Sequence, residues 1–320
     1  MTFAQLRSFA TVARLGSVRA AARELGVSEP AVSAALAGLR REFGDELLVR
    51  SGGGLRLTAG GARLAPAASE ILGVADEARR AIDASHGAAI LLRVAAVSEV
   101  AEHVAGPLIE AFTRRFQQVE VALQVEPASS FDGLLGDRLA DVALGPRPLG
   151  AAAPASLPFL RYRLAIVAAP GHRLVGRRAV PVAELASEKW LVGPSGAGPG
   201  TDTGAFLSRF RLAPDEPRAF PSHSAAVIGA EAGRGVMLAV AHTVLDELRR
   251  GTLVRLDVRG TPIEELWHAT TLSPERRPEG ASAMLRFITT PEATHAMLAR
   301  SGGVPAGRFR PPVHVTLWHS

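Results

Sequence analysis

Cysteine is absent from this chain of 320 residues, and lysine occurs once, at Lys189. Without a thiol, the protein can form no disulfide, no thiolate metal site and no cysteine nucleophile. The lack of cysteine also fits a reducing compartment. The remaining cationic side chains are arginines, and we interpret this preference as a bias of genome composition.

Long apolar runs are missing as well. The apolar stretches 164–169 and 236–241 are far shorter than the roughly 20 residues that cross a bilayer. The first 30 residues contain four arginines with no apolar core between them, so we expect neither a signal peptide nor a membrane partner. We expect a cytoplasmic protein, long enough for about two or three domains.

No catalytic constellation is recognisable. Lys189 follows Glu188, so it belongs to no phosphate-binding Gly-x-x-x-x-Gly-Lys motif. Residues 193–197 read Gly-Pro-Ser-Gly-Ala and miss the Gly-x-Ser-x-Gly motif, and 196–201 miss the dinucleotide-binding pattern. We therefore expect no enzyme activity, no catalytic residue and no cofactor.

The nine histidines are scattered and form no His-Glu-x-x-His motif. We interpret four of them as surface or satisfied core residues: His103, His172, His223 and His242. No metal ligand is assigned, although a metal bound in a cleft stays an open alternative.

Positive charge is concentrated near the N-terminus. Residues 1–65 contain nine arginines and five acidic residues, so most of the net charge of +5 lies there. A positive balance favours an anionic partner.

Three short helices are predicted within the first 45 residues, at 3–15, 18–25 and from Ser28 to about Phe43. Glycines end the first two, and serines cap the second and third. Small alanines at 20–22 allow the third helix to approach the second closely. This arrangement is typical of a helix-turn-helix.

Two short strand-like runs follow, at 47–50 and 55–58, around a glycine-rich tip. They predict a β-hairpin, which is a wing in this position. From Gly60 to about Ala84 the pattern is helical again, with one apolar stripe: Leu64, Ala68, Ile71, Leu72, Ala75, Ala78 and Ile82. A long amphipathic helix outside a compact domain is expected to bury its stripe against a partner chain. Residues 85–89 are interpreted as a hinge.

Beyond residue 90, strand-like and helical patterns alternate. Strands are predicted at 90–97, 119–125, 141–144, 164–168, 190–192, 235–240, 253–258 and 266–271, and the clearest helix at 99–116. Such alternation favours parallel sheets covered by helices on both faces. Over more than 200 residues, it indicates two α/β lobes. The tail 301–320 matches no element and is interpreted as disordered.

These residues carry a family resemblance. Gln5–Phe9, Gly16–Val18, Val27–Ser33, Leu47–Arg50 and Leu57–Gly60 resemble the DNA-binding domain of LysR-type transcriptional regulators. Strings in the rest of the chain, such as 140–145 and 232–236, are similar to those of the family's effector domain. The resemblance covers about residues 1–300 and is most specific over the first 65.

The resemblance implies an α plus α/β fold: a winged helix-turn-helix at 1–59, a dimerising linker helix and hinge at 60–89, and a two-lobed effector domain at 90–300, built like a periplasmic binding protein. Lobe one is expected at 90–161 and 268–300, and lobe two at 162–267. The implied partners are double-stranded DNA, a small-molecule effector bound between the lobes, RNA polymerase, and further copies of the chain in a tetramer assembled from dimers.

A recognition helix presents its first turns to base edges. Here those turns offer Ser28, Glu29, Pro30, Ala31, Ser33 and Ala34. The family more often has glutamine at Glu29 and a basic or polar residue at Ala34. We hypothesise that Glu29, which can only accept hydrogen bonds, shifts base preference toward cytosine; the alternative is that it only stabilises the helix dipole. Arg50 and Arg56, which flank the wing tip, are expected to reach phosphates or the minor groove, and Arg19 and Arg40 are further candidates for phosphate contacts.

Effector contacts are expected on loops that follow strands. The candidates are Ser98, Ser129, Ser130, Ser195, Gly196 and Thr201. Ser98 opens a helix and can help to hold an anion; the alternative is an ordinary helix N-cap. For the glycine-rich loop 194–201, the alternative is a plain flexible loop. The pattern slightly favours an anionic metabolite.

A second class of protein stays open, namely a solute-binding protein with an unrelated module at its N-terminus. A site-specific footprint on DNA would distinguish the two.

Overall fold

The computed structural model describes residues 1–51, 54–86, 88–147, 155–198 and 200–299. They form two compact units: Met1–Ala88 with Gly136–Leu139, and the other described residues from Ala89 onward. The predicted tail 301–320 lies outside the described residues, as do residues 52–53 of the predicted wing tip, residue 87 of the hinge and residue 199 of the glycine-rich loop. In the described part of the chain, no helix is both long and apolar enough to cross a membrane.

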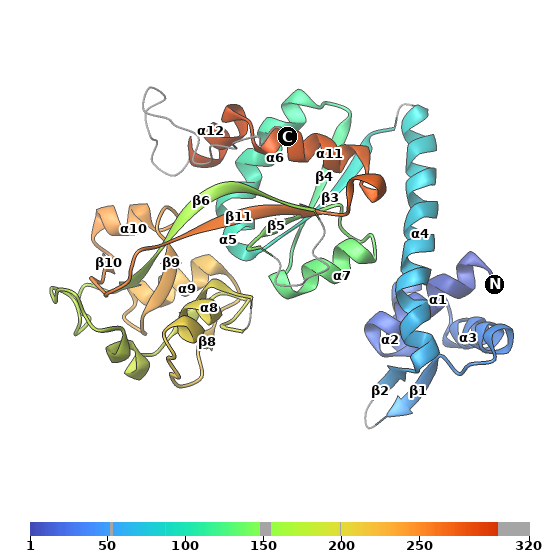
Figure 1. Cartoon of the computed structure of the whole chain (residues 1–320), viewed down its shortest axis with the longest axis horizontal. Coiled ribbons are helices and arrows are strands. Elements are labelled where there is room, and N and C mark those ends of the chain that lie inside the picture. Colours follow the sequence, from blue (N-terminus) through green and yellow to red (C-terminus); the bar gives the residue numbers. More distant parts are fainter. Residues whose placement is uncertain (52–53, 87, 148–154, 199, 300–320) are drawn as a thin grey trace, which may run out of the picture. The chain divides into compact units, whose positions relative to one another are not determined.

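The first unit begins with three helices, α1 (Phe3–Leu15), α2 (Val18–Leu25) and α3 (Glu29–Phe43) (Figure 1). Gly16 and Gly26 end α1 and α2 with φ angles of 65°, in the left-handed region that glycine tolerates. The hydroxyls of Ser17 and Ser28 accept N–H groups in the first turns of α2 and α3. The predicted boundaries of these helices are confirmed.

A hairpin of β1 (Leu48–Ser51) and β2 (Gly54–Leu57) follows, and then the long helix α4 (Ala59–Ser85). A side chain at Gly61 would lie 2.0 Å from the carbonyl oxygen of Leu47, so only glycine lets α4 start this close to the strand. The core of the unit joins α1, α2, α3 and the hairpin to two buried residues of α4, Ala68 and Leu72. Part of the predicted apolar stripe of α4 is therefore buried within its own chain.

The second unit contains seven strands in one sheet, in the order β10-β6-β11-β5-β3-β4, with β9 also paired to β6. Their bounds are β3 (Ile90–Ala96), β4 (Val119–Val125), β5 (Val142–Gly145), β6 (Ala155–Ala168), β9 (Met237–Val240), β10 (Val254–Arg255) and β11 (Ile263–Thr271). Two short strands, β7 (Leu191–Val192) and β8 (Arg218–Ala219), pair separately.

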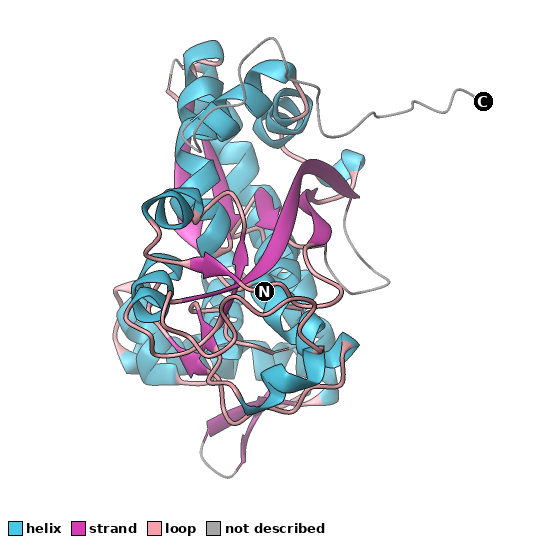
Figure 2. Ribbon diagram, turned by 90° about the vertical axis from the view of Figure 1, so that its left-hand side faces the viewer, coloured by secondary structure: helices cyan, strands magenta, loops and turns pink. Residues whose placement is uncertain are grey.

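The helices of this unit are α5 (Ser98–Val100), α6 (Gly106–Arg115), α7 (Phe131–Gly136), α8 (Asp202–Arg209), α9 (His223–Glu231), α10 (Leu245–Arg250), α11 (Glu279–Ile288) and α12 (Pro291–Ala299). Short 3-10 turns lie at Ala128–Ser130, Val182–Ser187 and Pro274–Arg276. The first lobe gathers around β3, β4 and β5, and the second around β9 and β10. The long strands β6 and β11 run through both lobes (Figure 1), and Figure 2 shows how strongly the long strands twist.

The expectation of parallel sheets is wrong for half of this unit. β3 pairs in parallel with β4 and β5, but β6 and β11 pair antiparallel with each other, and β11 is antiparallel to β5. The sheet is mixed because the chain returns along β6 and β11 instead of through crossover helices alone. The lobe boundaries expected at 161/162 and 267/268 fall inside these two strands, and the second one coincides with the register shift between Trp267 and His268.

Several elements differ in extent from the prediction. β9 begins at Met237 instead of 235, β10 covers only Val254–Arg255 of the expected 253–258, and β11 begins at Ile263 instead of 266. β6 begins at Ala155, whereas the sequence predicted a start at 164. The prediction missed the first part of the strand because Pro158, Arg161 and Arg163 interrupt its apolar pattern. The helix expected at 99–116 contains a π-helical turn, Ala101–Ala105, between α5 and α6. Such turns are rare, and periodicity does not reveal them.

Candidate DNA interface and effector cleft

The first turns of α3 face solvent. Six residues there are exposed: Ser28, Glu29, Pro30, Ala31, Ser33 and Ala34. On the opposite side of the helix, Val32, Leu36 and Leu39 are buried in the core and fix its orientation. The polar and small side chains predicted to read DNA are thus brought together on one accessible surface.

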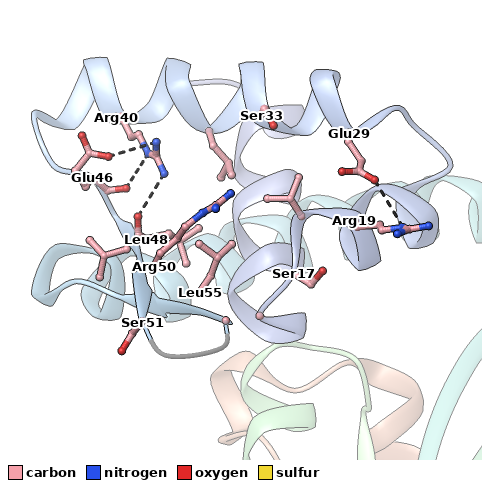
Figure 3. Close-up of a pocket in the computed structure, with 15 residues that line it drawn as sticks. Ser17, Arg19, Glu29, Ser33, Arg40, Glu46, Leu48, Arg50, Ser51 and Leu55 are labelled. Carbon is pink, nitrogen blue, oxygen red and sulfur yellow. Dashed lines mark hydrogen bonds and ion pairs between the residues drawn. The ribbon is translucent and has the colours of Figure 1, made fainter.

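Two residues of this surface, Glu29 and Ser33, line an open groove of about 980 Å³ between α2, α3 and the wing (Figure 3). Arg19, Glu29, Ser33, Arg40 and Arg50 line it. The side chain of Arg19 is 78% exposed, and its Nε lies 3.9 Å from the Glu29 carboxylate. Glu29 also stands in the first turn of α3, so base contact and helix-dipole stabilisation both fit its position.

Arg40 is held within the protein. Its Nε donates to the carbonyl of Glu46 at 2.9 Å and its Nη2 to that of Leu48 at 3.3 Å, while Nη1 lies 3.3 Å from the Glu46 carboxylate (Figure 3). These contacts tie α3 to the segment that enters the wing. Arg40, one of the expected phosphate contacts, therefore also holds the wing in position relative to α3, which the sequence did not reveal.

The two wing arginines lie on opposite faces of the hairpin. In the antiparallel register, Arg50 is opposite Leu55 and Arg56 is opposite Val49, and adjacent pairs alternate faces. Arg50 lines the groove together with Leu55, and Arg56 is not among the residues lining it. Both arginines are exposed.

In the second unit, Ser98 does not cap a helix. The N-cap of α5 is Val97, which has no side-chain hydrogen bond, so the N-cap interpretation of Ser98 is wrong. Ser98 is 2% exposed, and its hydroxyl donates to Glu102 and accepts the backbone N–H of His223 at 3.2 Å. The side chain thus joins two segments that lie 125 residues apart.

Glu102 binds the start of α9. Its Oε1 accepts the N–H of His223 at 2.9 Å, and its Oε2 accepts the N–H and the hydroxyl of Ser224 at 3.0 and 2.5 Å. Although partial burial raises it, these donors and the hydroxyl of Ser98 lower the pKa of Glu102 to about 2. The carboxylate is therefore ionised throughout the physiological range.

Three histidines gather near this contact. The ring of His223 is buried; its Nε2 lies 3.2 Å from the Thr243 hydroxyl, and its Nδ1, 3.7 Å from Glu99, has no hydrogen-bond partner. The ring of His103 meets it edge-on, with the centroids 5.4 Å apart. His242 packs edge-on against Trp267, and burial, followed by the charges of the other two histidines, lowers its pKa to about 4. The interpretation of the four histidines as surface or satisfied core residues is corrected for three of them, because Nδ1 of His223 and the Nε2 atoms of His103 and His242 are buried without a hydrogen-bond partner. His172 is hydrogen-bonded to Glu188.

A second carboxylate lies at the start of α8. Burial is the main reason why the pKa of Asp202 rises to about 7, and the charges of Glu99 and Glu265 act in the same direction. Both of its oxygens accept the hydroxyl of Tyr162, whose ring stacks on Trp267 with centroids 4.6 Å apart. Burial, and then the charge of Asp202, raise the pKa of Tyr162.

Two adjoining cavities meet at Asp202. The inner cavity, of about 30 Å³, is lined by Glu99, His223 and three of the predicted residues, Ser195, Gly196 and Thr201. The outer cavity, of about 790 Å³, has charged residues of both signs on its walls, among them Arg147, Arg209, Glu264 and Glu265. Leu164, Thr201 and Asp202 line both.

The predicted effector residues are only partly brought together. Thr201 also caps α8 by accepting the N–H of Gly204 at 3.0 Å. Ser129, which is exposed, and Ser130 lie in the turn after β4 and line neither cavity. The sequence missed Glu99, Glu102, Tyr162, Asp202 and His223. Within the described ranges, no group of three or more metal-binding side chains is arranged to hold an ion.

Two family models match this chain. Residues 3–62 match the bacterial regulatory helix-turn-helix protein of the LysR family, and residues 85–291 match the LysR substrate binding domain. The chain belongs to the LysR family of transcriptional regulators. As a LysR-type regulator, it is a DNA-binding transcription factor whose second unit is an effector-binding domain.

Relatives in this family align over nearly the whole chain. The uncharacterised HTH-type transcriptional regulator Rv0377 of Mycobacterium tuberculosis is 41% identical over 99% of this chain and 100% of its own length. CfxR of Cupriavidus necator is 30% identical over 96% of this chain and 97% of its own.

Solved structures share the fold. CbnR, a LysR family transcriptional regulator, aligns with a TM-score of 0.59 at 20% identity, over 95% of this chain and 100% of that one. A mutant of Corynebacterium glutamicum OxyR aligns with a TM-score of 0.56 at 20% identity, over 94% of each chain. The two-unit architecture predicted from the sequence is confirmed at the level of fold class.

Proposed function

We propose that this LysR-type regulator reads its operator with the first turns of α3 and anchors itself on phosphates with the surrounding arginines. The observation that carries this proposal is the groove in which the exposed Glu29 and Ser33 lie beside Arg19 and Arg50. Polar side chains on a helix N-terminus can reach base edges in the major groove, and arginines beside them neutralise phosphates. Ser28, Pro30, Ala31 and Ala34 belong to the same proposed contact surface, with Arg56 and the outer part of Arg40 at its edge.

Dimers are proposed to form through α4. Its exposed apolar positions follow one another at spacings of four, three, four and four, namely Ala67, Ile71, Val74, Ala78 and Ile82. Ile71 is 39% and Val74 50% exposed, which is unusual for large apolar side chains in a row. Such a stripe suits a second copy of the same helix. We further propose that two such dimers form a tetramer in the cytoplasm and that this tetramer acts together with RNA polymerase on the DNA.

The effector is proposed to bind where the two cavities of the second unit adjoin. Ser195, Gly196 and Thr201 contribute to its inner end, and Ser98 supports the same region through Glu102. Residues of both lobes line this region, so a ligand there can favour one arrangement of the lobes over another. We propose regulation rather than catalysis as its purpose. Ser129 and Ser130 stay predicted contacts that no observation yet supports.

The experiment is a footprint of the purified full-length chain on DNA from upstream of its own gene, with scrambled DNA as the control, at several salt concentrations. We expect a protected site with paired half-sites about 10 base pairs, or a multiple of that, apart. Affinity should fall steeply with salt. Equal binding to both DNAs would overturn sequence-specific regulation and favour a solute-binding protein with a basic N-terminus.

A further inference from the structure

We propose that Glu102 is a built-in carboxylate ligand, which fills an anion-binding seat made by Ser98 and the start of α9 and thereby joins the two lobes without an anionic effector. The seat consists of the Ser98 hydroxyl, the backbone N–H groups of His223 and Ser224, and the Ser224 hydroxyl. The ligand class that it recognises is a small carboxylate.

The contact is saturated on both oxygens. Oε1 accepts from Ser98 and from the N–H of His223, and Oε2 accepts twice from Ser224. Four donors on one carboxylate are the full complement that such a group can accept in good geometry. A surface ion pair formed by chance rarely reaches this number, because long side chains lose entropy when they are fixed.

The position of the donors explains their preference for an anion. The N–H groups of His223 and Ser224 belong to the first turn of α9, a helix of nine residues, and such groups have no partner within the helix. They also lie at the positive end of the helix dipole. Beside these donors, the ring of His223 is buried, and its Nδ1 lies 3.7 Å from the carboxylate of Glu99.

Glu102 connects elements of different lobes. It stands on the π-helical turn that continues from β3, whereas α9 packs against β6, β7 and β9. Glu102 lies within the π-helical turn Ala101–Ala105, a rare conformation that is frequent at functional sites. The charge comes from the protein itself, so the lobes can be held together in the absence of any ligand.

The surroundings make a second anion unfavourable. Glu99 lines the adjoining inner cavity, and its charge opposes that of an incoming carboxylate or phosphate. The expectation of an anionic metabolite therefore does not fit this part of the cleft. An effector that reaches the inner cavity should present an uncharged or cationic group to it.

The test replaces Glu102 by alanine in the full-length chain and uses sodium acetate as the probe. We expect the melting temperature of the second unit to fall by on the order of 5 °C, because three hydrogen-bond donors lose their acceptor and the N–H of His223 keeps only the Ser98 hydroxyl. Acetate should restore it with a saturable dependence on concentration, measured against sodium chloride at equal ionic strength. The matched control is Glu110→Ala, an exposed glutamate on α6.

Acetate should not stabilise the wild-type chain or the Glu110→Ala variant. A second variant, Glu102→Gln, fills the seat with a neutral side chain, so it should be destabilised but not rescued by acetate. If acetate acts equally on all chains, or if Glu102→Ala melts at the wild-type temperature, the built-in ligand is ruled out. Should Glu102→Ala not fold, rescue of Glu102→Gln by acetate would overturn the proposal, and an unrescued, destabilised variant would support it.

The idea that Glu102 replaces an anionic effector in joining the lobes rests on the proposed function, but the test with acetate does not. Rescue by acetate is measured without DNA, so its failure would leave the footprint on the operator unaffected. Conversely, the absence of a footprint on the operator would not affect the rescue of Glu102→Ala by acetate.

Discussion

The hydroxyl of Tyr162 lies 2.8 Å from Asp202 Oδ1 and 3.0 Å from Oδ2, so a tyrosine of β6 holds the carboxylate that opens α8. The ring of Tyr162 is itself fixed by stacking on Trp267 of β11. Three elements of the second unit therefore meet at a carboxylate that is largely removed from water. This burial places its titration near neutral pH, with a pKa of about 7.

Asp202→Asn should remove a pH dependence of stability. The folded state raises the pKa of Asp202 from 3.8 to about 7, so it holds the proton more tightly than the unfolded chain does. The contribution of this group to the free energy of unfolding is then complete below about pH 4 and is lost as the pH rises to about 7. The asparagine keeps an acceptor for Tyr162 and does not titrate.

The advantage of the variant over the wild type should therefore grow between pH 4 and 7 and level off above. It should reach on the order of 1–2 kcal/mol, less than the full shift implies, because the site relaxes and is partly solvated. Urea unfolding at a series of pH values measures it, and Asp215→Asn, at an exposed position, is the control. A difference between variant and wild type that is constant with pH would contradict the raised pKa.

Local signals in the sequence predicted the first unit closely. Gly16 and Ser17, and Gly26 and Ser28, end one helix and cap the next by rules that involve only neighbouring residues. The split of the α4 stripe was not predictable from periodicity, since burial of Leu72 and exposure of Ile71 depend on which side meets the core.

The cleft of the second unit depends on contacts between distant segments. Glu102 meets Ser224 across about 120 residues, and no local pattern announces that pairing. The π-helical turn that contains Glu102 and the antiparallel return of β6 and β11 are also not announced by any local pattern. Ser195 and Thr201 could be placed at the cleft only because the chain resembles a family with a known arrangement of strands.

Arg50→Ala should weaken DNA binding without destabilising the protein. The side chain is exposed and lines the groove beside α3, so it is placed to contact a phosphate. Loss of one phosphate contact should lower the affinity about equally for all sequences and reduce the slope of log affinity against log salt by about one. Fluorescence anisotropy at several salt concentrations measures the slope. Arg56→Ala, on the other face of the wing, should lower the DNA affinity less. An equal loss of affinity in both variants would show that the two faces of the wing contribute equally to DNA binding.

Arg40→Ala should act on stability first. It removes two hydrogen bonds to carbonyls at the entry of the wing and one contact with Glu46. Because the side chain is 37% exposed, water replaces part of these interactions, and the loss should be about 1 kcal/mol. Thermal unfolding measures it, with the exposed Arg41→Ala as the control. An unchanged melting temperature combined with a reduced salt slope would instead assign Arg40 to phosphate contact alone.

Glu29→Gln should change the preferred base. Glutamate can only accept, for example from the N4 amino group of cytosine, whereas glutamine can pair with two atoms of adenine. Selection of binding sites from a random pool should therefore show adenine in place of cytosine at one position of each half-site. Glu42→Gln, at the other end of the same helix, removes an equal charge and serves as the control. If the selected sites stay the same and only the stability falls, Glu29 acts on the helix dipole alone.

Val74→Asp should dissociate the dimer that we propose along α4. The position is 50% exposed and lies within the apolar stripe that includes Ile71 and Ala78. A carboxylate buried there without a partner costs about 3–5 kcal/mol, so self-association should weaken by at least about a hundredfold. Sedimentation velocity over a series of concentrations measures it, with circular dichroism to show that the helix content is kept. Ala62→Asp puts the same charge on the opposite side of α4 and should leave the assembly unchanged.

Because paired half-sites require two recognition helices held at a fixed distance, Val74→Asp should also lose the cooperative footprint while keeping weak binding to a single half-site. A variant that remains dimeric would mean that another surface joins the two copies, and the exposed stripe would then need a different partner.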